Sequence, residues 1–316
     1  MTGNEIITLL SNNLSTLLSP VKLVVGALIT SIFLRRDTSS TEFEKIKAGM
    51  FKDVAKNLLE SGRMTYVEFY QSNNFLAVAE KADKYYSDTH HNNANINTNY
   101  DFDWFVRMYE AVGNVSDEKM QDLWAKLLAA EVSNPSSYSL KTIDVLRNLS
   151  KKDAELFEVI CSHSFYNKSQ RPVLPRYDGY LEKYNILYMD IMKLKEQGLI
   201  YSESTIGQKL HITGERELLF WNNKTVMTIE TSDGNDSEVL ISEYPFTQVG
   251  YELSKLVSQS PSEEKYIEFA KQLSDQYKNH SLGVYRVLAL NETKIEYDDK
   301  NLLDSVFLSS KENNDK

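Results

Sequence analysis

The chain has 316 residues, of which 41% are hydrophobic and 25% are charged. This length exceeds what one hydrophobic core usually organises, and the composition excludes a chain that is disordered throughout, so we expect about two domains. The formal net charge of -10 disfavours phosphate backbones and anionic lipid as partners of the whole molecule, and nucleic acid is therefore not an expected partner.

The single cysteine, Cys161, has no second thiol for a disulfide, which favours a reducing compartment. Glu5 has the wrong sign for the cationic start of a secretory signal, and export is not expected. Both features predict a cytoplasmic protein, with attachment to the inner face of the membrane as the alternative.

Residues 1–38 are predicted to form an apolar helical hairpin. Apolar residues recur at helical offsets from Glu5 to Leu18, Pro20 interrupts them, and a second apolar run extends from Val21 to Leu34. This run is shorter than the ~20 residues of a spanning helix, so we interpret it as buried or as an oligomer contact, with partial membrane insertion as the alternative. The candidate membrane or oligomer residues are Leu23, Val24, Val25, Leu28, Ile29, Ile32, Phe33, Leu34, Arg35 and Arg36.

Residues 39–86 are predicted to be a helical region, which opens with the capping-box pattern of Thr41 and Glu44. A helical pattern resumes from Thr65 to Lys84 after a stop at Gly62. Residues 87–100 are rich in asparagine, whose side chain bonds its own backbone and competes with helix and strand. They are predicted to form a linker.

The strongest helical pattern lies in residues 101–162, which are predicted to form a helical bundle. Ser116 is expected to cap a helix with an apolar stripe on one face, and further helices are expected after Asn134 and after Ser150. The aromatic rings and the stripe of this bundle supply the candidate interaction or scaffold residues, which are Trp104, Trp124, Leu127, Leu128 and Glu131.

Residues 163–295 are predicted to form a winged-helix-like α+β domain, followed by a polar tail at residues 296–316. The pattern indicates one helix over residues 181–198, strands at 217–221, 225–230 and 238–242, a helix capped by Thr247, a long helix from Pro261 and a strand at 283–290. The predicted fold class is therefore mainly α with a small β element. The helix at 181–198 carries equal numbers of acidic and basic residues, which makes a DNA-binding regulator a secondary alternative.

Catalytic and cofactor motifs are not recognisable in the sequence. His90 and His91 lie in the predicted linker, and Cys161 and His163 fit helix packing better than a thiolate–imidazole pair. Neither phosphate-binding loop motif is present. We predict no catalytic residue, no metal, no cofactor and no enzyme activity, while a carboxylate hydrolase of unrecognised fold stays an alternative.

The stretch from Asp103 to Ile160 closely resembles an uncharacterised bacterial family of unknown function, and the likeness continues more weakly to about residue 290. Its LWAKLLA segment, followed by a leucine-rich stretch and LSKKDA, is also similar to the abortive-infection alpha family. The resemblance implies a role in phage defence that works through contacts, and it supplies no catalytic residues.

The leading hypothesis is a non-enzymatic interaction, sensor or regulatory protein whose partner is another protein or a second copy of the chain. A homo-oligomer is expected. The alternatives are a membrane-acting effector that uses residues 6–34 and the winged-helix DNA-binding regulator.

Overall fold

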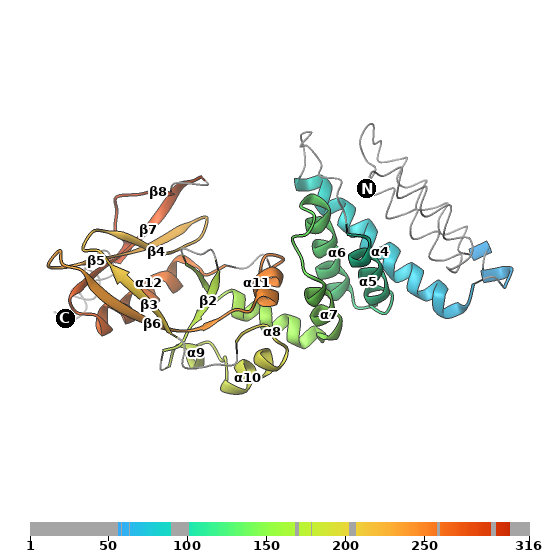
Figure 1. The fold of residues 1–316 in the computed structure, drawn as a ribbon, viewed down its shortest axis with the longest axis horizontal. Helices are drawn as coiled ribbons and strands as arrows, with labels where there is room; N and C mark the ends of the chain where they lie inside the picture. The colour runs from blue at the N-terminus through green and yellow to red at the C-terminus, as the bar shows by residue number, and fades with distance from the viewer. Residues whose placement is uncertain are drawn as a thin grey trace, which may run out of the picture. The chain divides into compact units, whose positions relative to one another are not determined.

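The computed structural model describes residues 56–57, 59–62, 64–89, 101–167, 171–177, 179–201, 207–257, 260–291 and 295–303 (Figure 1). The chain divides into two compact units, Met1–Lys151 and Lys152–Lys316. The predicted hairpin at 1–38 and the pattern at Thr41 and Glu44 lie outside the described residues.

Four labelled helices make up the described part of the first unit: α4 (Tyr66–Thr89), α5 (Phe102–Val112), α6 (Glu118–Ser133) and α7 (Leu140–Asn148). Side chains cap their first turns. Thr65 and Glu68 form a capping box at α4, and Asp101 accepts hydrogen bonds from the first amides of α5. The cap of α6 is Asp117, because its carboxylate reaches the amides of Lys119 and Met120; the prediction of Ser116 was wrong by one residue.

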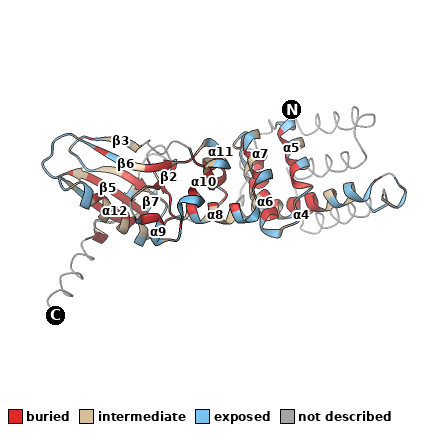
Figure 2. Cartoon of the chain, turned by 90° about the horizontal axis from the view of Figure 1, so that it is seen from below, coloured by how far each residue is buried: buried red, intermediate tan, exposed pale blue. Residues whose placement is uncertain are grey.

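The core of the first unit lies between α4 and α6, with α5 packed on α4 and α7 (Figure 2). Each helix contributes buried apolar side chains at three- and four-residue spacing, which is how an amphipathic helix hides one face. The largest of these side chains are Phe75, Leu76, Met108, Trp124, Leu127 and Leu128.

The second unit is built on an antiparallel sheet of eight strands in the order β3-β6-β2-β1-β4-β5-β7-β8. The sheet curls into a half-barrel, which brings its edge strand β3 close to β5. The strands are β1 (Phe165–Tyr166), β2 (Pro172–Pro175), β3 (Gly207–Ile212), β4 (Glu217–Trp221), β5 (Thr225–Thr231), β6 (Ser237–Pro245), β7 (His280–Leu290) and β8 (Ile295–Tyr297).

Five helices accompany the sheet: α8 (Lys151–Cys161), α9 (Tyr180–Lys183), α10 (Tyr188–Glu196), α11 (Gln248–Ser254) and α12 (Glu263–Gln276). Helix α12 packs against β5 and β7. The ring of Phe269 on α12 lies 4.7 Å from that of Phe165 and 5.4 Å from that of Phe220, between centroids. Aromatic contacts of this kind fix the helix on the sheet.

The predicted fold class, mainly α with a winged-helix-like domain and a small β element, is wrong. The strands predicted at 217–221, 225–230, 238–242 and 283–290 are present, but they belong to the eight-stranded sheet. Strand β2 begins and ends with proline, which lacks the amide hydrogen of a strand residue and therefore argues against a strand in sequence. The single helix predicted at 181–198 is two short helices, because Asn185 adopts a left-handed conformation with φ of 56°.

Candidate functional site

Two predicted scaffold residues of the first unit, Trp104 and Glu131, meet at the connection between α6 and α7. The indole Nε1 of Trp104 donates to the carbonyl oxygen of Tyr138 at 2.8 Å. The Glu131 carboxylate accepts from the amides of Ser136, Ser137 and Tyr138 at 2.6, 3.1 and 3.0 Å. Tyr138 is thus held through both its amide and its carbonyl, so these two side chains fix the course of the connection.

Glu131 is only 2% exposed, and two opposing effects act on the pKa of its carboxyl. Burial raises the pKa of this carboxyl, while the three backbone amides lower it. One of those amides belongs to Ser136, which has a φ of 68°, a conformation that costs energy for a residue other than glycine. The Glu131 contacts therefore hold a strained turn in place.

The other three predicted scaffold residues, Trp124, Leu127 and Leu128, are fully buried in α6. They pack inside the first unit and present no area to a partner. Their contribution is to the core on which the α6–α7 connection rests.

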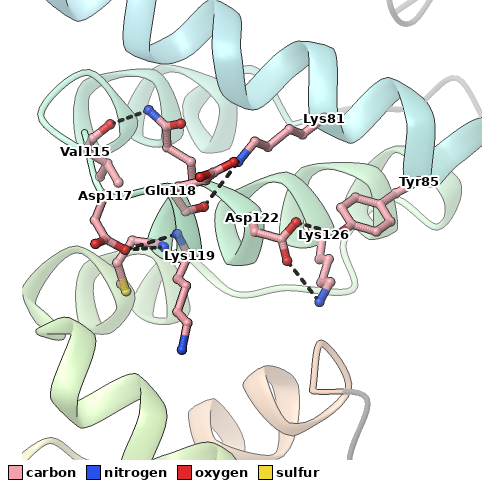
Figure 3. Close-up of polar contacts among 10 residues, drawn as sticks. Lys81, Tyr85, Val115, Asp117, Glu118, Lys119, Asp122 and Lys126 are labelled. Atoms are coloured by element: carbon pink, nitrogen blue, oxygen red, sulfur yellow. Dashed lines mark hydrogen bonds and ion pairs between the residues drawn. The ribbon is translucent and has the colours of Figure 1, made fainter.

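Polar side chains join α4 to α6 along one side of this core (Figure 3). The Tyr85 hydroxyl donates to one oxygen of Asp122 at 2.5 Å, and the ammonium of Lys126 lies 3.1 Å from the other. Burial raises the pKa of Asp122, but the bonds from Tyr85 and Lys126 outweigh it and hold that pKa below its ordinary value. Lys81 donates to the backbone oxygen of Glu118. These groups are paired with one another, as expected of a seam between helices.

Cys161 and His163 lie at the end of α8 and do not form a catalytic pair. Burial raises the pKa of the Cys161 thiol far above its ordinary value, so the thiolate is strongly disfavoured. The Nδ1 of His163 is 2.9 Å from the carbonyl oxygen of Val159, which assigns it a helix-capping role.

A serine–histidine contact lies at the end of the sheet, where Ser237 Oγ is 2.7 Å from His280 Nε2. A catalytic triad requires an acceptor on the opposite ring nitrogen. Within the described part of the chain, His280 Nδ1 has no hydrogen-bond partner. The orienting group of a triad is thus not supplied by these residues.

The described ranges also contain no group of three or more histidine, cysteine, aspartate or glutamate side chains placed to hold a metal ion. Among the helices of those same ranges, none is long and apolar enough to cross a membrane. The candidate membrane residues from Leu23 to Arg36 lie outside the described residues.

An exposed apolar run marks the start of α10 in the second unit. Leu187, Tyr188 and Met189 are consecutive, and their exposed fractions are 60%, 68% and 71%. Asp190 accepts a hydrogen bond from the Leu187 amide and so fixes the turn that presents them. Helical spacing then places Lys195, seven residues after Tyr188, on the same face of α10.

Two cations border this run at the ring of Tyr244 in β6. The Lys195 ammonium lies 4.9 Å from the ring centroid and the Arg176 guanidinium 5.8 Å from it. Burial raises the pKa of Tyr244, Arg176 acts in the opposite direction, and Tyr188 is near enough to add to the rise. Among the residues that the structure describes, neither cation has a carboxylate within ion-pair distance. We call Leu187, Tyr188, Met189, Lys195 and Arg176 the Tyr188 surface.

The family comparison covers most of the two units. Residues 61–271 match the model of a family described as a protein of unknown function, DUF2806. The chain belongs to this family. The DUF2806 match includes the α6–α7 connection and the Tyr188 surface, and it ends within α12, before β7 and β8. No curated protein and no solved structure matches the chain.

Membership in DUF2806 confirms the predicted resemblance to a family of unknown function, and it extends that likeness to residues before Asp101. It shows no link to abortive infection. Sequence reasoning missed the Tyr188 surface, because a Leu-Tyr-Met run within an apparently continuous helix is typical of a buried face. The signal that could have revealed it is Asn185, a residue that tolerates the left-handed conformation and so permits a break.

Proposed function

We propose that this DUF2806 protein is a non-enzymatic interaction protein, and that its Tyr188 surface binds an acidic segment of a protein partner that also carries apolar side chains. The observation that carries the proposal is the consecutive exposure of Leu187, Tyr188 and Met189. Contiguous exposed apolar area on a folded protein is typical of binding sites.

The energetics favour a protein partner at this surface. Burying a large apolar side chain is worth about 1.5–3 kcal/mol, and three neighbouring ones supply a compact anchor. Tyrosine is enriched at the centres of such anchors because it offers area at little cost in side-chain entropy. Because Tyr188 stands on a turn fixed by Asp190, its main chain is already ordered before binding.

The charges beside the anchor determine the kind of partner. Arg176 and Lys195 of the Tyr188 surface lie over the ring of Tyr244 within a chain whose net charge is -10, and carboxylates of a partner would complement them. The partner is therefore an acidic segment with apolar anchors, and a basic segment would meet two cations of like charge.

Selection from a random dodecapeptide library on the immobilised full chain tests this proposal. We expect the enriched peptides to combine Asp or Glu with Leu, Phe or Trp. Tyr188→Ala and Lys195→Glu should each weaken binding at least about tenfold by fluorescence anisotropy, which corresponds to the loss of one central anchor or one charge pair. Tyr66→Ala is the matched control, since Tyr66 is 81% exposed in the first unit.

Peptides that bind Tyr188→Ala as tightly as the unchanged chain would contradict the proposal, and so would enrichment of basic peptides. A second copy is the other possible occupant. Sedimentation velocity that shows a dimer which Tyr188→Ala dissociates would assign the surface to self-association instead.

Membrane contact through residues 6–34 stays a separate prediction, as does the phage-defence role. Flotation with anionic liposomes tests the first of these. The full chain should float and a variant lacking residues 1–38 should stay at the bottom of the gradient, because apolar area in that segment drives insertion. Equal distribution of the two proteins would rule out membrane contact through this segment.

A further inference from the structure

Strand β6 carries a buried carboxylate that has no compensating group among the described residues. Glu243 lies on β6 opposite Pro175 of β2, and it is 5% exposed. Strand alternation places its side chain on the same face as those of Val239 and Ile241, both fully buried. In the described part of the chain, Glu243 Oε2 has no hydrogen-bond partner.

Two further buried polar atoms of the second unit, one after β2 and one on α12, also lack partners among the described residues. Tyr177 follows β2, its ring lies 5.4 Å from that of Phe269 on α12, and its hydroxyl is close enough to Glu243 for their charges to interact. Gln272 is one turn beyond Phe269 on α12. The structure gives neither the Tyr177 hydroxyl nor the Gln272 Oε1 a hydrogen-bond partner among the described residues, although both atoms are buried.

Buried polar atoms without partners are rare in native proteins and call for a ligand, an ion or water. The unmatched atoms here share one property: the carboxylate and the amide oxygen are acceptors, and the phenol oxygen can also accept. A group that donates hydrogen bonds would match all three oxygens, and a positively charged donor would also offset the buried charge of Glu243.

We propose that Glu243, Tyr177 and Gln272 form a binding site for the ammonium group of a primary amine. An ammonium carries three N–H donors and one positive charge, which matches three acceptors of which one is a carboxylate. The aromatic rings of Tyr177 and Phe269 could stabilise a desolvated cation through cation–π interactions. A divalent metal fits less well, because Mg²⁺ and Ca²⁺ require six or more oxygen ligands and favour several carboxylates.

The site is distinct from the Tyr188 surface. Tyr177 and Gln272 are half-buried as residues, while their unpartnered oxygens are buried. Tyr244, beneath the Tyr188 surface, is the next residue of β6, and strand alternation turns it to the opposite face of the sheet from Glu243. Loss of one site thus leaves the other in place.

Thermal unfolding of the full chain at pH 8 tests the site with methylammonium chloride as the probe. Tetramethylammonium chloride at equal concentration is a cation without N–H donors, and potassium chloride is the ionic-strength reference. Because a ligand that binds only the folded state raises its stability, methylammonium at about ten times its Kd should raise the Tm by about 3 °C above both references. Glu243→Gln should abolish this shift and Tyr177→Phe should at least halve it.

Glu238→Gln is the matched control, since Glu238 is an exposed glutamate on the same strand that pairs with Lys209, and the shift should persist in this variant. Equal shifts with methylammonium and tetramethylammonium would overturn the proposal, as would a shift that survives Glu243→Gln. The absence of any shift in the unchanged chain would leave water as the occupant and also refute it. None of these outcomes depends on peptide binding at the Tyr188 surface.

Discussion

Glu131→Ala is expected to destabilise the first unit by about 3 kcal/mol, because a buried hydrogen-bond acceptor is removed while its donors stay. The amide of Tyr138 is buried and loses its acceptor outright, whereas those of Ser136 and Ser137 can turn to water in part. The strained backbone conformation of Ser136 also loses the hydrogen bond to Glu131 that stabilises it. The anchoring of the α6–α7 connection thus depends on this one side chain and on Trp104.

Urea unfolding followed by tryptophan fluorescence measures this loss. Because Trp221 lies in β4, a Trp221→Phe background leaves Trp104 and Trp124 as the reporters of the first unit. Glu131→Gln should also be destabilising, since both carboxylate oxygens accept and the amide would place an NH₂ group against an N–H donor. Glu118→Ala, at an exposed position of the same helix, is the control. A loss for Glu131→Ala no larger than that of the control would contradict the assigned role.

The helices of the first unit could be predicted from sequence because their signals are local. The apolar stripe through Trp124 and Leu128 repeats with the helical period, and a capping carboxylate lies within a few residues of the amides it accepts from. The cap of α6 was missed by only one residue, since Ser116 and Asp117 are both good capping types and only the backbone geometry selects between them.

The sheet could not be predicted in full, because its partners are distant in sequence. Strand β1 has two residues and becomes a strand through pairing with β2 and β4, and β6 lies between β2 and β3. Curling brings β3 towards β5, which no local pattern encodes. The same reason hides the two candidate sites. The ring of Tyr244 meets Lys195 and Arg176, and Tyr177 comes to lie beside β6, only after the strands have paired.

Glu243 is expected to give the second unit a pH dependence that is opposite in sign to that of a salt-bridged glutamate. Burial raises the pKa of this carboxyl from its ordinary value of 4.5 to about 7. Between these values the folded chain binds the proton and the unfolded chain releases it, so stability falls as pH rises. The stabilisation is fully present below pH 4.5 and is lost as pH rises through 7, a total of about 3 kcal/mol at 1.36 kcal/mol per pH unit.

Glu243→Gln keeps the size of the side chain and removes its charge. The variant should therefore match the unchanged chain near pH 4.5 and exceed its stability by up to about 3 kcal/mol at pH 8. Urea unfolding measures the free energy of unfolding of both proteins at several pH values. The difference between the two proteins isolates the contribution of Glu243, because the other titrating groups are the same in both. Glu238→Gln, at an exposed position of the same strand, should not gain stability at pH 8. A flat difference for Glu243→Gln would mean that the carboxylate is not desolvated.

The amine site and this pH dependence involve the same buried charge, which links the two predictions. At pH 8 the buried, ionised carboxylate destabilises the folded chain, and bound methylammonium would offset this destabilisation. The probe should therefore reduce the difference in stability between the unchanged chain and Glu243→Gln. Below pH 7 the carboxyl holds its own proton, and the amine must displace it. Methylammonium should therefore stabilise the unchanged chain less at pH 5 than at pH 8, although the amine is fully protonated at both. A simple effect of salt on surface charges would stabilise the unchanged chain and Glu243→Gln equally at each pH.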